Sequence, residues 1–129
     1  MNEIDKICSE LGVPVSDKFT QDWAYELPEK YRTKEWLSKY IAAYLNNGYS
    51  QKGKNELMTL SLDVCNDLLS SGVPPSDKVI VKALNTLLDN YKNHIDLINY
   101  WALDDESLED SFALTPEIRE LKKKIDLGL

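Results

Sequence analysis

The sequence contains few of the residues that usually mark a chemical site. Its 129 residues include one histidine, two cysteines and five glycines. Gly53 stands alone between two lysines, so there is no glycine-rich phosphate loop, and the sequence has no HExxH, GxSxG or paired-cysteine metal pattern. These absences argue against an enzyme, and we expect neither a metal site nor a cofactor.

The scarce reactive residues that are present fit structural positions. Cys8 and Cys65 each lie in an apolar helical stripe, which favours small reduced core residues over a disulfide or a metal site. His94 lies on another apolar stripe, where a single histidine is expected at the boundary of the core. Carboxylate pairs such as Asp63 with Asp67 fit a solvated helix face as well as they fit acid–base chemistry.

Long apolar runs are missing too. No stretch approaches the roughly 18 consecutive apolar residues that a membrane span needs. The N-terminus, MNEIDKICSELG, is acidic and lacks the apolar core of a signal peptide, so we expect a cytoplasmic protein with no membrane partner. The hydrophobic content of 43% and the three tryptophans argue against disorder. The length predicts one domain over residues 1–129.

Helical periodicity, in contrast, runs through the whole chain. No run alternates with period two for long enough to form a strand. Thr33 and Ser50 are suited to open helices. Thr115 as N-cap and Pro116 at the first helical position open the last one, which Gly128 closes. The spacing predicts helices over residues 3–11, 17–26, 34–45, 50–69, 77–101 and 115–127. We therefore expect an all-α fold of five to six helices packed as consecutive antiparallel hairpins.

A short cassette occurs twice, as GVPVSDK at residues 12–18 and as GVPPSDK at residues 72–78. A glycine can end a helix in the left-handed conformation, and a proline prevents its continuation. Ser16 and Ser76 are expected to be the N-caps of the helices that follow. Each cassette therefore predicts the end of one helix and the start of the next.

The likeness extends beyond the cassettes at the same offset. Positions in the first half match positions in the second, pairing Leu27, Tyr31, Leu37, Tyr40 and Ala42 with Leu87, Tyr91, Leu97, Tyr100 and Ala102. The matches indicate either a helical duplication, with units 3–48 and 60–103, or two helix corners that acquired the same residues independently. Pro28 interrupts the first copy, whereas the second is expected to run through Leu88 without a break.

Charge is unevenly distributed along a chain whose net charge is −7. Residues 30–54 form a basic segment with aromatic residues among its cations, which are Lys30, Arg32, Lys34, Lys39, Lys52 and Lys54. Basic residues interleaved with aromatics can bind nucleic acid. However, most of these aromatics lie on the seam that a helix over 34–45 needs for its core, and the negative net charge opposes a polyanion. Nucleic-acid binding therefore ranks behind protein binding.

The opposite extreme of charge is the stretch DDESLED at residues 104–110, in which five of seven residues are acidic and none is basic. It follows Tyr100 and Trp101 at the end of a predicted helix. Aromatic side chains anchor protein interfaces, and carboxylates at the rim attract a basic partner. The candidate contact surface is therefore Tyr100, Trp101, Asp104, Asp105, Glu106, Glu109 and Asp110. The alternative is that the two aromatics complete the core and the acids only aid solubility.

The stretch DLINYWALDDES at residues 96–107 resembles a short segment of bacterial DNase-type immunity proteins, which reads roughly DLIYYP and is followed by acidic residues. The matching positions are Asp96, Leu97, Ile98 and Tyr100; Asn99 and Trp101 differ. The resemblance implies a small acidic helical protein that binds a basic nuclease toxin beside its active site. We therefore expect an immunity or inhibitor protein. The alternatives are a helical-repeat adaptor for a protein or peptide, and a small-ligand protein or enzyme with a pocket between helices.

Overall fold

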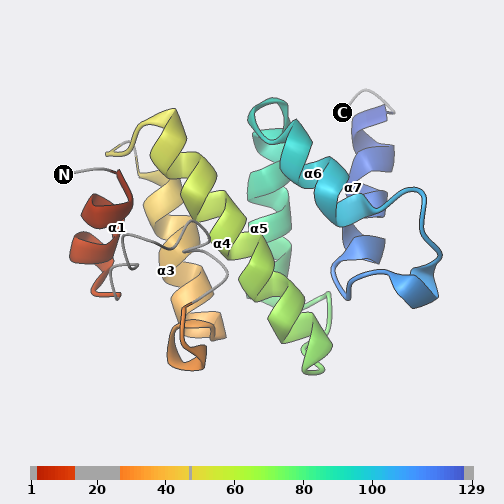
Figure 1. Cartoon of the computed structure of the whole chain (residues 1–129), viewed down its shortest axis with the longest axis horizontal. Coiled ribbons are helices and arrows are strands. Elements are labelled where there is room, and N and C mark those ends of the chain that lie inside the picture. The colour runs from red at the N-terminus through yellow and green to blue at the C-terminus, as the bar shows by residue number, and fades with distance from the viewer. Residues whose placement is uncertain (1–2, 14–26, 47, 127–129) are drawn as a thin grey trace. The chain divides into compact units, whose positions relative to one another are not determined.

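The computed structural model describes residues 3–13, 27–46 and 48–126, and the regular structure in these ranges is entirely helical (Figure 1). The α-helices are α1 (Glu3–Leu11), α3 (Lys34–Leu45), α4 (Gln51–Ser70), α5 (Lys78–Asp89), α6 (Ile95–Ala102) and α7 (Thr115–Asp126). Short 3-10 helices lie between them, η1 (Glu29–Tyr31), η2 (Tyr91–Asn93) and η3 (Leu108–Asp110). Six α-helices and no strand in the described ranges confirm the all-α fold.

Some sequence-based expectations fall outside these ranges. The helix predicted over residues 17–26, the N-cap at Ser16 and the helix end at Gly128 all lie outside the described residues. Within the described part of the chain, no helix is both long and apolar enough to cross a membrane. Two predicted helix starts are confirmed. The Thr33 hydroxyl accepts a hydrogen bond from the Trp36 amide at 3.3 Å, and the Ser50 hydroxyl accepts one from the Gly53 amide at 3.4 Å.

The chain forms two compact units, residues 1–64 and 65–129, and each is described by itself. In the first unit, α1 is tied to the turn before α4. Lys6 donates a hydrogen bond to the carbonyl of Gly48 at 2.7 Å, and the Tyr49 hydroxyl donates one to the Glu10 carboxylate at 2.7 Å. The buried apolar residues of this unit are Ile7, Cys8, Val13, Leu27, Leu37, Tyr40, Ile41, Ala43, Tyr44, Tyr49, Leu57, Met58, Leu60, Leu62 and Val64.

In the second unit, α7 packs against both α5 and α6. The buried apolar residues come from every α-helix of the unit and from the end of the loop before α7; they are Cys65, Leu68, Ile80, Ala83, Leu87, Ile98, Trp101, Ala102, Leu114, Ile118 and Leu121. Full burial of an aliphatic side chain stabilises a fold by about 1.5–3 kcal/mol. A long-range polar contact adds to this packing, because the Leu114 amide donates to the Asn66 side chain at 3.0 Å.

The two glycine corners share one backbone arrangement. Gly12 and Gly72 have φ of 76° and 104°, in the region that favours glycine. In each corner the amide of the following valine donates a hydrogen bond to the carbonyl five residues earlier, the six-to-one bond of a helix end. The Val13 amide donates to the Cys8 carbonyl at 3.1 Å, and the Val73 amide donates to the Leu68 carbonyl at 3.0 Å. The prediction that these glycines end helices is confirmed.

The N-cap prediction at the second corner is wrong by one residue. Asp77, and not Ser76, caps α5, and its carboxylate accepts a hydrogen bond from the Val79 amide at 3.0 Å. Serine and aspartate are both good N-cap residues, so the pair Ser76–Asp77 does not fix the register. An ionised cap also interacts favourably with the positive end of the helix dipole, which a serine hydroxyl does only weakly.

The prediction of a single helix over residues 77–101 is also wrong. It is interrupted between α5 and α6, where Asn90 and His94 have φ of −124° and −134°. The Asn90 side chain donates to the Thr86 carbonyl at 2.9 Å and so satisfies an acceptor in the last turn of α5. α5 runs through Leu88 without a break, as predicted, and ends at Asp89, so the interruption comes after the position that matches Pro28. The duplication itself stays a prediction, and one matched pair differs in burial, since Tyr40 is buried and Tyr100 is exposed.

The cap assignment gives a direct test. Replacing Asp77 by alanine should lower the free energy of unfolding by about 1 kcal/mol, because the Val79 amide loses its acceptor. Ser76→Ala is the matched control and should change it by less than about 0.5 kcal/mol. Urea unfolding followed by circular dichroism measures both. A larger loss of unfolding free energy in the Ser76→Ala variant would show that Ser76 is the N-cap.

Candidate functional site

The acidic loop, residues 103–111, connects α6 to α7 and carries the candidate contact residues. Its five acids are all exposed. η3 lies within it, so part of the loop has regular backbone. The loop begins at Leu103, which has a left-handed conformation with φ 42° and ψ 53°. That conformation costs a residue other than glycine about 1–2 kcal/mol, so surrounding contacts must hold it in place.

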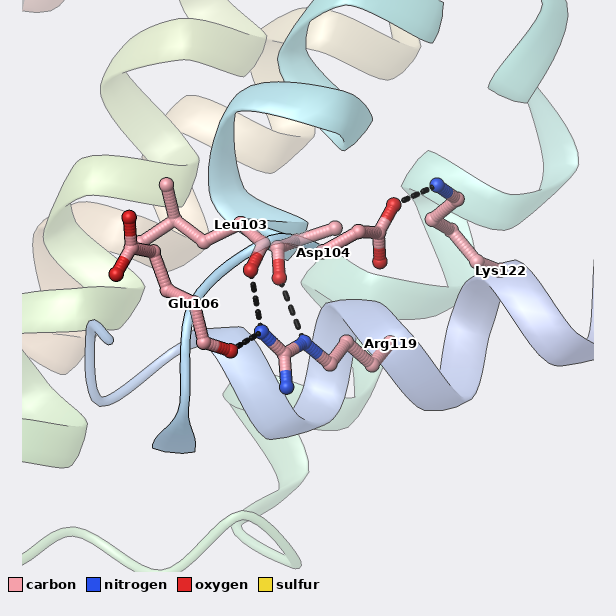
Figure 2. A network of polar contacts seen from close by, with 6 residues as sticks. Leu103, Asp104, Glu106, Arg119 and Lys122 are labelled. Atoms are coloured by element: carbon pink, nitrogen blue, oxygen red, sulfur yellow. Dashed lines mark hydrogen bonds and ion pairs between the residues drawn. The ribbon is translucent and has the colours of Figure 1, made fainter. Parts of the chain in front are cut away.

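Arg119 of α7 supplies those contacts from beneath the loop (Figure 2). Its Nε donates to the Ala102 carbonyl at 2.7 Å, and its Nη2 donates to the carbonyls of Leu103 and, at 2.8 Å, Glu106. These acceptors include the last residue of α6, whose terminal carbonyls lack partners within the helix. A cation at this end also complements the helix dipole. The guanidinium therefore fixes the loop through its backbone.

This arrangement leaves most of the loop's carboxylates available. Figure 2 shows the carboxylate of Glu106 pointing away from Arg119, while its carbonyl accepts the hydrogen bond. Asp104 forms an ion pair with Lys122, and Asp110 accepts a hydrogen bond from Ser107 at 3.1 Å. The carboxylates of Asp105, Glu106 and Glu109 have no ion pair within the described part of the chain. Three negative charges thus sit on a backbone held in one shape.

An aromatic cluster lies at the base of the loop. Phe112, just after the loop, stacks on Tyr100 with ring centroids 5.7 Å apart and meets the Trp101 ring at 4.9 Å. The Phe112 amide donates to the Thr115 hydroxyl at 3.1 Å, which in turn donates to the Trp101 carbonyl at 2.7 Å. Thr115 is thus the first residue of α7 and a bridge to α6, in place of the expected cap. The cluster brings the two ends of the loop together.

The two aromatics predicted for the contact surface have different positions. Trp101 is 2% exposed, so the expectation that it contacts a partner is corrected, and it belongs to the core. Tyr100 is 49% exposed and stays a surface candidate. Leu108, in the loop, is 59% exposed, and sequence reasoning missed it together with Phe112 and Arg119. A large apolar residue inside an acidic run was the available signal for Leu108.

In the basic segment, the alternative contact face, Lys30, Lys34, Lys39 and Lys52 are exposed, whereas Arg32 is not. Arg32 pairs with Asp63, and its side chain is only 8% exposed, so it is not part of such a face. Lys30, Lys39 and Lys54 each lie over an aromatic ring of the same unit. Their ammonium groups are 5.1 Å from the Tyr31 ring centroid, 4.1 Å from that of Trp36 and 5.6 Å from that of Tyr44. These lysines occupy rings on which nucleic-acid bases would have to stack.

The reactive residues are buried. Cys8 and Cys65 are reduced thiols buried in the core, and burial raises the pKa of Cys65 to about 12, which makes its thiolate scarce. His94 is 2% exposed, inside the core rather than at its boundary, and burial lowers its pKa. Within the described ranges, no three histidine, cysteine, aspartate or glutamate side chains are grouped so that they could hold a metal ion.

Comparison with known proteins adds no relative. No family model, curated protein or solved structure matches the chain. The resemblance of residues 96–107 to immunity proteins therefore stays an expectation.

Arg119 should determine the stability of the loop. Arg119→Met removes three donors to backbone carbonyls and should lower the free energy of unfolding by about 2 kcal/mol. Amide exchange in residues 103–111 should accelerate as well. Lys122→Met, which removes the exposed pair with Asp104, is the control and should cost less than about 1 kcal/mol. Equal losses in the two variants would contradict the role of the guanidinium.

His94 should make stability depend on pH. Burial favours its neutral form in the folded state, so the unfolded chain binds the proton more tightly. The free energy of unfolding should therefore fall as the pH drops from about 6.5, the unfolded value, towards the lower folded pKa. His94→Asn removes the only histidine and should flatten this part of the profile. Urea unfolding at a series of pH values gives both curves, and parallel curves would count against the effect.

Proposed function

We propose that this chain is a protein-binding module that docks a basic protein through the acidic loop and Tyr100. The observation that carries the proposal is the loop itself, in which Arg119 holds the backbone while Asp105, Glu106 and Glu109 present unpaired carboxylates. A preformed loop loses little conformational entropy when it binds, so more of the interaction energy appears as affinity. Fixed negative charge also accelerates the encounter with a cationic partner.

Apolar surface next to the charges supports protein rather than ion binding. Tyr100 and Leu108 are both exposed, and they flank the acids in sequence. Stable interfaces usually combine such apolar anchors with a polar rim. Trp101 then acts from within the core, where it supports Tyr100 through an edge contact at 5.1 Å.

The biological role that fits best is inhibition of a basic toxin, and the charge of the loop favours a nuclease. A nuclease binds phosphates with cationic side chains, and a row of carboxylates on a rigid loop competes for the same charges. The similarity of residues 96–107 to immunity proteins supports this choice. In this role the chain performs no catalysis, because it occupies the toxin's surface and excludes nucleic acid.

A helical-repeat adaptor is the second candidate, and the matching glycine corners favour it. Both corners end a helix with the same six-to-one hydrogen bond and the same Gly–Val pair. An adaptor would bind its partner along surfaces formed by successive helices. It would therefore tolerate neutralisation of the acidic loop, which the inhibitor would not.

Charge neutralisation tests the proposal. The triple variant Asp105→Asn, Glu106→Gln, Glu109→Gln should fold normally, since exposed charges contribute little to stability. Its association with a basic protein captured from the source cells should be about tenfold slower at low salt, and the difference should shrink as salt is added. A captured nuclease should also be inhibited less by the variant than by the original chain.

The matched control is Glu35→Gln, Asp89→Asn, Asp126→Asn, which removes the same charge from exposed positions outside the loop. It should bind almost as fast as the original chain. If both triple variants bind alike, net charge alone governs association and the acidic loop is not the docking site.

A further inference from the structure

We draw no further inference here: the strongest candidate, the aromatic cluster of Tyr100, Trp101 and Phe112 at the base of the acidic loop, where the Trp101 Nε1 is buried without a hydrogen-bond partner among the described residues, belongs to the site already described, and nothing in the structure shows what would bind the indole.

Discussion

The hydrogen bonds of Arg119 to the carbonyls at the end of α6 are the constraint on which the candidate surface depends. They stabilise Leu103 in a conformation that side chains seldom adopt, and they set the direction in which the chain leaves the helix. One half-buried guanidinium thereby organises an anionic surface without pairing with its carboxylates.

The two units use their charged residues in opposite ways. In the first unit, cations are bound internally: Arg32 pairs with Asp63, and lysines such as Lys39 lie against aromatic rings. In the second, the five acids of the acidic loop remain exposed.

The parts that the sequence predicted are those decided by neighbouring residues. Helical spacing located the helices, and Gly72 marked a real helix end, since both depend on local backbone preferences. The break near Asn90 escaped prediction because the apolar stripe continues across it. Arg119 was missed since its acceptors lie 13 to 17 residues away, and the burial of Trp101 was undecided because one stripe served both interpretations. The sequence located the acids of the loop, but it did not predict the contacts that hold the loop's backbone.

The backbone of the two glycine corners determines which chirality of amino acid could replace the glycine. At Gly12 and Gly72 a Cβ would meet no atom within 4 Å, so space does not exclude a side chain. The positive φ does, because it suits the mirror image of an ordinary amino acid. A D-alanine at either corner would adopt this backbone without strain and would also restrict the unfolded chain. The corners thus select chirality rather than size.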